Sequence, residues 1–147
     1  SPPLRTEDDR NALVQGLVDE TIDVIVSDHK PEDEENKRLT FAQAETGASG
    51  IETLLPLSLE LYHNGSVKLE TIIKALTSSP AKILKINKGN LSIGNDADFC
   101  IVDINKPWVV RKEKLISKSK NTPIEDKKLQ GKVMNTFVNG EELFKAE

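Results

Sequence analysis

Cysteine and histidine are scarce in this 147-residue chain, and their scarcity excludes several kinds of site. The single cysteine, Cys100, can form no internal disulfide, and because it lies in an apolar run we expect a buried, inert thiol. Two histidines and one cysteine cannot supply the usual ligands of a structural zinc ion. If a metal takes part in the chemistry, most of its ligands must come from outside these residues.

Long apolar runs and a one-sided charge are also missing. No stretch approaches the roughly 20 apolar residues of a membrane-spanning helix, and residues 1–5 do not resemble a signal peptide. The net charge is −4 with both signs intermixed, so the chain lacks the basic face that binds a phosphate backbone. We therefore expect a cytoplasmic protein whose partners include neither a membrane nor a nucleic acid.

The first part of the chain mixes helical and extended patterns. Thr6 precedes acidic residues and then apolar residues at helical spacing, which predicts an amphipathic helix that ends near Asp19. Residues 21–26 are rich in β-branched side chains and predict a mostly buried strand, with Asp28 at its carboxyl end. Residues 30–38 are almost wholly charged and favour a solvated loop.

Three further helices are predicted before residue 87. A glycine-containing segment leads into a helix over 51–61, with Pro56 in its first turn or at a kink. A second helix is expected over 66–76. A shorter third helix is expected to bury Ile83 and Leu84.

After residue 87 the pattern changes to short extended runs separated by turns. Three strands are predicted, at 97–102, 108–110 and 132–138. Asn139-Gly140 then gives a strong hairpin signal. We place a boundary near residue 87, between an α/β part (1–86) and a β part (87–147). A parallel sheet needs several strands with helices on both of its faces, and one strand with its helices cannot supply them. Residues 1–86 are therefore expected to be the last part of a larger unit.

Asp28 and His29 lie where the predicted strand meets a loop, the position at which (β/α) barrels carry catalytic groups. From the residues alone this pattern is weak, and the alternative is that Asp28 caps the following turn while His29 is exposed. Structural roles are favoured for His63 at a helix end and for Trp108 beside a proline.

Co-linear motifs resemble the dihydroorotase type of amidohydrolase. They are Ser1-Pro2-Pro3-Leu4-Arg5, the run from Thr21 to Asp28-His29, Gly50-Ile51-Glu52-Thr53, Ser79-Pro80-Ala81, and Ser117-Lys118-Ser119-Lys120-Asn121-Thr122-Pro123. Their order and spacing extend over essentially all 147 residues. The resemblance implies an α/β chain in which residues 1–86 are the C-terminal segment of a (β/α)8 hydrolase barrel and residues 87–147 supply strands of a small β-sandwich domain.

The resemblance also implies a reaction, the reversible zinc-dependent cyclisation of N-carbamoyl-L-aspartate to dihydroorotate in pyrimidine synthesis. Asp28 occupies the position of a carboxylate that ligates zinc and relays a proton from the attacking water to the departing amide nitrogen. The other zinc ligands would lie in a missing N-terminal part of the protein. This fragment alone is therefore expected to be inactive.

Substrate-binding positions match the family less completely. The resemblance assigns substrate contacts to Ser1, Glu32, Thr46 and Gly47. The family usually has asparagine in place of Ser1 and histidine in place of Glu32. A carboxylate at position 32 would repel the substrate carboxylate unless it turned away or was protonated, and Lys30 or Arg5 are candidates to compensate its charge. At Thr46 and Gly47 we expect contact through main-chain N–H groups.

Two alternatives remain for the function. One is a non-catalytic homologue that serves as a structural partner of aspartate transcarbamoylase, which would suit the departures at Ser1 and Glu32. The other is a related cyclic amidase, such as a hydantoinase or allantoinase. The expected partners are a small-molecule substrate, the N-terminal part of the same protein, further copies in a homo-oligomer and, as one option, aspartate transcarbamoylase.

Overall fold

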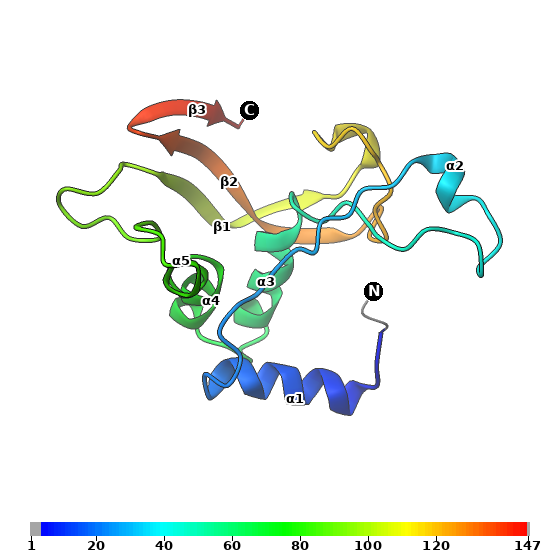
Figure 1. Cartoon of the computed structure of the whole chain (residues 1–147), viewed down its shortest axis with the longest axis horizontal. Helices are drawn as coiled ribbons and strands as arrows, with labels where there is room; N and C mark the ends of the chain where they lie inside the picture. The colour runs from blue at the N-terminus through cyan, green and yellow to red at the C-terminus, as the bar shows by residue number, and fades with distance from the viewer. Residues whose placement is uncertain (1–3, 147) are drawn as a thin grey trace.

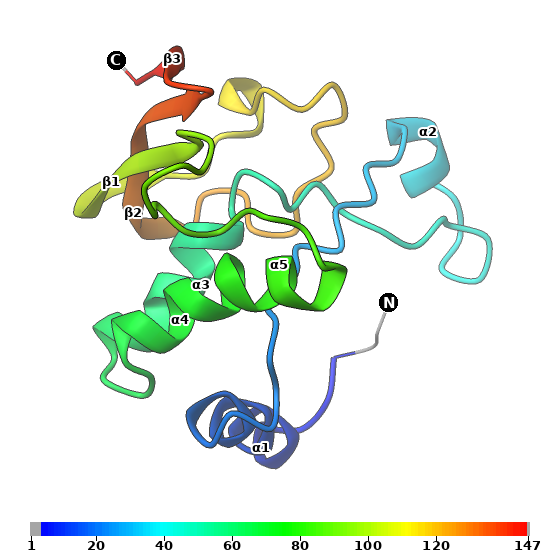
Figure 2. The same cartoon turned by 60° about the vertical axis from the view of Figure 1, so that its left-hand side comes forward.

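A computed structural model describes residues 4–146 of the chain, which combine α-helices with one antiparallel sheet. The elements are α1 (Glu7–Val18), α2 (Glu34–Lys37), α3 (Leu54–His63), α4 (Leu69–Leu76), α5 (Ser78–Leu84), β1 (Phe99–Val109), the 3-10 helix η1 (Lys112–Lys114), β2 (Lys128–Val138) and β3 (Glu141–Lys145). In Figures 1 and 2 a layer of three helices, α3 to α5, lies between the sheet and α1.

The first helix, α1, begins and ends as predicted. Thr6 and Asp9 form a capping box: the Thr6 hydroxyl accepts the Asp9 N–H at 3.3 Å, and the Asp9 carboxylate accepts the Thr6 N–H at 3.1 Å. The helix ends at its C-cap, Asp19. Leu17 is buried, but Leu13 and Val18 are exposed. Only part of the apolar stripe of α1 is therefore covered by the described residues.

Residues 21–26 run as an extended segment from α1 toward α2 (Figure 1), but they pair with no strand within residues 4–146. The Ile25 N–H donates to the Ala75 carbonyl of α4 at 3.2 Å. Val26 is 71% exposed. The prediction of a mostly buried strand is therefore wrong for this structure, because a strand needs a neighbour for its ladder and cover on its faces. The described residues provide no neighbouring strand and only partial cover, since Ile22, Val24 and Ile25 are half-buried.

Two further predictions about the first part of the chain need correction. Residues 30–38 are not loop throughout, since they include the one-turn helix α2, which buries no residue. In α5, Ile83 and Leu84 are 59% and 68% exposed, and Ala81 is the buried residue. No described element covers the side of α5 that carries Ile83 and Leu84. The helix is present, but its buried face was wrongly assigned.

The sheet has the order β1-β2-β3 with antiparallel pairing. One long strand, β1, replaces the two predicted strands at 97–102 and 108–110. The polar residues between them remain part of the strand, and its register with β2 shifts there, between Asp103 and Pro107. The predicted hairpin at Asn139-Gly140 is confirmed. Both residues have positive φ, +51° and +81°, as a type I′ turn requires.

Cys100 is exposed, contrary to the expectation of a buried thiol. Successive residues of a strand face opposite sides, so an apolar run on a half-covered strand does not bury every member. Phe99, the residue before it, stacks on Phe137 with ring centroids 4.6 Å apart. The Cys100 pKa is nevertheless raised, because the surrounding sheet partly desolvates the thiol.

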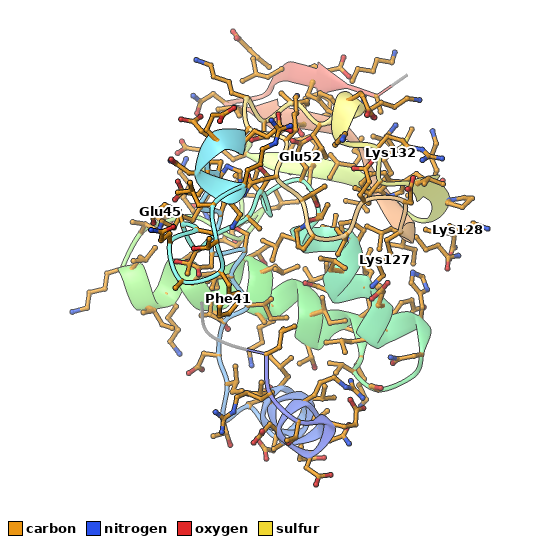
Figure 3. The ribbon with its side chains drawn as sticks, turned by 90° about the vertical axis from the view of Figure 1, so that its right-hand side faces the viewer. Phe41, Glu45, Glu52, Lys127, Lys128 and Lys132 are labelled. Atoms are coloured by element: carbon orange, nitrogen blue, oxygen red, sulfur yellow. The ribbon has the colours of Figure 1, made fainter. Side chains whose placement is uncertain are left out.

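The helices and the sheet share one core. Leu59 of α3 and Ile72 of α4 are fully buried, and Leu59 contacts Gly131 of β2. The ammonium of Lys127, which is labelled in Figure 3, lies 2.8 Å from the carboxylate of Glu60 in α3. Residues before and after the predicted boundary near residue 87 therefore pack directly on one another. The described residues contain one sheet, so they do not confirm the expected β-sandwich.

Candidate functional site

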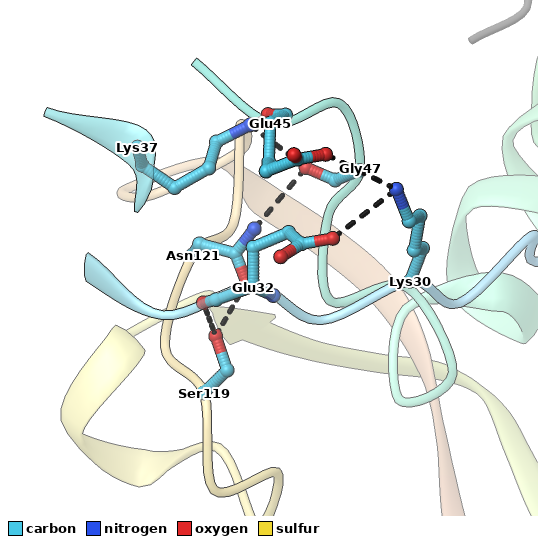
Figure 4. Close-up of polar contacts among 7 residues, drawn as sticks. All are labelled: Lys30, Glu32, Lys37, Glu45, Gly47, Ser119 and Asn121. Carbon is cyan, nitrogen blue, oxygen red and sulfur yellow. Dashed lines mark hydrogen bonds and ion pairs between the residues drawn. The ribbon is translucent and has the colours of Figure 1, made fainter. Parts of the chain in front are cut away.

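Three segments distant in the sequence lie side by side and contain most of the predicted site residues (Figure 4). They are residues 28–32, 46–52 and 115–121, which we call the three-segment cluster. The Lys30 N–H donates to the Ala48 carbonyl at 3.1 Å, and the Ser49 N–H donates to the Asn121 carbonyl at 3.0 Å. Main-chain bonds therefore link the first segment to the second and the second to the third.

Asp28 follows the extended segment 21–27 and turns the chain toward the cluster. Its φ is +43°, in the left-handed region that aspartate tolerates better than most residues. The side chain is exposed, and within residues 4–146 its carboxylate makes no hydrogen bond. A carboxylate at a chain reversal with both oxygens free can accept a ligand from outside these residues.

His29 fixes the position of this turn. Its Nδ1 atom accepts the Gly50 N–H at 3.1 Å and the Ile51 N–H at 3.3 Å. An accepting nitrogen carries no proton, so the contact requires an unprotonated Nδ1. His29 is half-buried, and the alternative with an exposed His29 and a capping Asp28 is not what the structure shows.

Glu32 is charge-paired within the cluster. Its side chain is 15% exposed, and one oxygen lies 3.2 Å from the Lys30 ammonium, which also lies 3.7 Å from the Glu45 carboxylate (Figure 4). Of the two candidate compensating cations, Lys30 is therefore the partner. Arg5 instead lies 3.5 Å from the Asp9 carboxylate at the start of α1.

Thr46 and Gly47 form the neighbouring loop. Thr46 is exposed, and no hydrogen bond engages the N–H of either residue in the described part of the chain. Gly47 has a φ of +132°, and a Cβ there would collide with the Lys30 carbonyl. The close approach to the Asp28 loop therefore requires glycine. Ser1, the remaining predicted substrate contact, lies outside the described residues.

Three polar residues of the cluster received no role from sequence reasoning. The Asn121 side chain contacts both the Glu32 N–H and the Gly47 carbonyl, Ser119 contacts the Glu32 carbonyl, and Glu52 accepts the N–H groups of Ile116 and Ser117. All three belong to motifs that carry the family resemblance. Their positions in these motifs could have marked them as candidates. Their contacts could not be predicted, because a motif does not show which distant segments the fold brings together.

The residues assigned structural roles do make structural contacts. His63 Nε2 lies 3.0 Å from the Ile104 carbonyl of β1. Trp108 donates its indole N–H to the Gly131 carbonyl at 2.9 Å. The His63 contact therefore joins α3 to β1, and the Trp108 contact joins β1 to β2 within the sheet.

A metal site would need ligands beyond this chain's described residues. No group of three or more His, Cys, Asp or Glu side chains in residues 4–146 is arranged to hold a metal ion. Within the three-segment cluster, Glu32 and Glu52 are already bonded, and Asp28 offers the free carboxylate, which suits one position of an oxygen- and nitrogen-ligated site. The donor set present therefore fits a single ligand. Among residues 4–146, no helix is long and apolar enough to cross a bilayer.

The amidohydrolase family model matches residues 2–143, almost the whole chain. The chain belongs to the amidohydrolase family. Within this family it is 45% identical over 147 residues to the dihydroorotase of Ehrlichia chaffeensis and 44% identical over 147 residues to the dihydroorotase of Anaplasma phagocytophilum. These identities confirm the resemblance to dihydroorotases. The chain spans 33% of the length of each of these two proteins.

The fold of this amidohydrolase segment is shared with a solved structure. L-hydantoinase (dihydropyrimidinase) from Arthrobacter aurescens superimposes on 99% of the chain with a TM-score of 0.92 at 30% sequence identity. The chain again covers only 34% of that protein. The chain that contains the three-segment cluster therefore corresponds to about one third of the length of that protein.

Proposed function

We propose that the full-length protein is a dihydroorotase, which reversibly cyclises N-carbamoyl-L-aspartate to dihydroorotate in pyrimidine biosynthesis. The observation that carries the proposal is the 45% identity to a dihydroorotase along the entire chain. The free carboxylate of Asp28 at a chain reversal supports it. The 147 residues alone are expected to be inactive, because they provide one metal ligand of the several that hydrolysis requires.

Asp28 is proposed as both metal ligand and proton relay. A bound zinc ion would supply the Lewis acidity that makes water attack on an amide carbonyl feasible at neutral pH. Asp28 would take the proton of the attacking water and deliver it to the departing amide nitrogen. The exposure of its side chain leaves both oxygens available for these roles.

Substrate contacts are proposed for Ser1, Glu32, Thr46 and Gly47. The N–H groups of Thr46 and Gly47 have no acceptor within residues 4–146, so they can bind a substrate oxygen. Glu32 is paired with Lys30, which offsets the repulsion that a bare carboxylate would exert on the carboxylate of the substrate.

The larger assembly follows from the same proposal. Residues 1–86 would complete a (β/α)8 barrel with the N-terminal part of the protein, which would supply a neighbour for the extended segment 21–26. Residues 87–147 would join a β-sandwich domain. A cytoplasmic homo-oligomer, with aspartate transcarbamoylase as one candidate partner, completes the proposal.

A related cyclic amidase is the second candidate. The observation that favours it is the TM-score of 0.92 and 30% identity to the L-hydantoinase from Arthrobacter aurescens. The full-length protein should therefore be assayed with dihydroorotate, hydantoin and allantoin side by side. Preferred turnover of hydantoin or allantoin would reject the dihydroorotase assignment while keeping the reaction class.

Asp28→Asn in the full-length protein tests the proposed relay. Asparagine tolerates positive φ, so this substitution removes the carboxylate without the backbone strain that alanine would add. We expect kcat to fall at least about 10²-fold. Asp33→Asn is the matched control, because Asp33 caps α2 without a side-chain hydrogen bond. Retained turnover in Asp28→Asn would remove Asp28 from the mechanism.

A further inference from the structure

We propose that Asn121 is a positioning residue of the reaction, because its carboxamide holds the loop that carries Asp28 and Glu32 against the loop that carries Thr46 and Gly47. The proposal rests on the proposed function, which places the substrate between these loops. Asn121 itself would touch neither the substrate nor the metal. It would act by fixing the separation of groups that do.

The two halves of the carboxamide contact different loops (Figure 4). Asn121 Oδ1 accepts the Glu32 N–H at 3.2 Å, and Nδ2 donates to the Gly47 carbonyl at 3.1 Å. The main-chain carbonyl of Asn121 accepts the Ser49 N–H at 3.0 Å. One residue therefore bonds to the backbone of both loops, and a shift of either loop would break at least one bond.

The main-chain groups of the two loops fix the orientation of the carboxamide, and serine hydroxyls lie beside it. The Ser119 hydroxyl lies 2.6 Å from Asn121 Oδ1 and also contacts the Glu32 carbonyl. The Ser49 hydroxyl donates to the Ser119 carbonyl at 2.9 Å. A reversed amide would place its NH2 group against the Glu32 N–H and its oxygen against the Gly47 carbonyl, so only one orientation satisfies both loops.

Glu52 anchors the segment that carries Asn121. Its two carboxylate oxygens accept the N–H groups of Ile116 and Ser117, each at 2.9 Å. Bonds to an ionised acceptor are stronger than neutral ones. Because Glu52 precedes α3 by two residues, these bonds attach residues 115–121 to the buried helical layer. Asn121 can thus serve as a fixed reference point for the two loops.

The catalytic consequence follows from distance. A misplacement of about 1 Å between reacting groups can lower a rate by about 10²-fold. Asp28 is four residues from Glu32 in the sequence, and Gly47 follows Thr46 directly. Loosening the Gly47 side would weaken substrate contact, whereas loosening the Glu32 side would also misplace Asp28.

Two substitutions in the full-length protein separate these effects. Asn121→Asp keeps the acceptor for the Glu32 N–H but places an oxygen against the Gly47 carbonyl, so KM for dihydroorotate should rise about tenfold while kcat changes less. Asn121→Ala removes the side-chain bonds to both loops and should lower kcat as well. Asn105→Ala is the control, because Asn105 is exposed and its side chain makes no hydrogen bond within the described residues.

Amide hydrogen exchange of the same proteins provides a readout that does not depend on turnover. Asn121→Ala should speed exchange in peptides that span 28–33 and 46–50 and leave α4 unchanged. Faster exchange together with the KM and kcat changes would support the proposal. Kinetics equal to those of Asn105→Ala would overturn it, whether exchange changed or not. A wild-type protein that did not turn over dihydroorotate would reject the proposed function, and faster exchange would still support the link between the loops.

Discussion

The β-sheet and the three-segment cluster are stabilised by different kinds of hydrogen bonds. In the sheet, β1, β2 and β3 are joined by main-chain ladders. In the cluster, side chains such as His29, Glu52 and Asn121 accept or donate to the main chain of distant segments. A ladder forms with many different side chains, and so do the main-chain bonds of the cluster, whereas each of these side-chain bonds needs one particular residue.

This difference predicts different vulnerabilities. The sheet should tolerate loss of a polar side chain but not a change in packing against α3. The cluster should lose its arrangement when a single polar side chain is removed, even though most of that region is half-buried or exposed. The comparison can therefore be tested with a substitution that disturbs packing in the sheet and a substitution that removes a polar side chain from the cluster.

The largest effect on stability is expected from Gly131→Ala in β2. Gly131 has a φ of +106°, and its Cβ would collide with the Cδ1 atom of Leu59, a fully buried side chain. Gly94→Ala is the control, because Gly94 has a φ of +95° and open space around it. Both variants should lose about 1 kcal/mol from backbone strain. Gly131→Ala should lose about a further 1–3 kcal/mol from overpacking.

Urea denaturation of the two variants in the full-length protein measures this difference. An equal loss of unfolding free energy in both would show that the contact between α3 and β2 accommodates the extra methyl group. The sheet would then depend on its ladders alone.

A smaller effect is expected from Glu52→Ala in the cluster. The N–H groups of Ile116 and Ser117 would lose a charged acceptor, and we expect a loss of about 1–2 kcal/mol. Glu113→Ala is the control, because Glu113 is exposed in η1 and has no side-chain partner within residues 4–146. Hydrogen exchange should become faster across 115–121 in Glu52→Ala. Equal protection of this segment in the two variants would contradict the anchoring role of Glu52.

The same contrast explains which parts of the fold the sequence could predict. The N-cap at Thr6 and the Asn139-Gly140 hairpin depend on residues that are close in the sequence, and both were predicted correctly. No element within residues 4–146 covers Val26, Ile83 or Leu84, so here the hydrophobic pattern predicted burial that the structure does not show. Cys100 shows a third case, because an apolar run does not reveal which of its alternate residues faces the core.

The cluster could be predicted only in part. Asp28, Glu32 and Gly47 were identified through a family resemblance, and the structure brings Glu32 and Gly47 onto one carboxamide. Asn121 contacts Glu32 from 89 residues away, and no local pattern encodes a contact of that range. The pairing of Lys30 with Glu32 was one of two options on charge alone, and only the chain path decides between Lys30 and Arg5.

The smallest effect is expected from the charge of Asp98, which borders the sheet. The Lys88 ammonium lowers the pKa of the Asp98 carboxyl from its ordinary value of 3.8, and the Asn139 N–H, which donates at 2.8 Å, lowers it further. A lowered pKa in the folded state means that the stabilising contribution is present above the ordinary pKa and is lost as the pH falls through the folded pKa.

NMR titration of the Asp98 carboxyl carbon should therefore give a midpoint below 3.8. Asp98→Asn should abolish this part of the acid sensitivity of stability, whereas Asp23→Asn should leave it intact, because Asp23 is exposed and unbonded within the described residues. Salt should weaken the effect, since Lys88 and Asp98 are in contact with solvent. A midpoint at or above 3.8 would mean that the Asn139-Gly140 hairpin is held by its turn geometry and ladder, without help from the charge at Asp98.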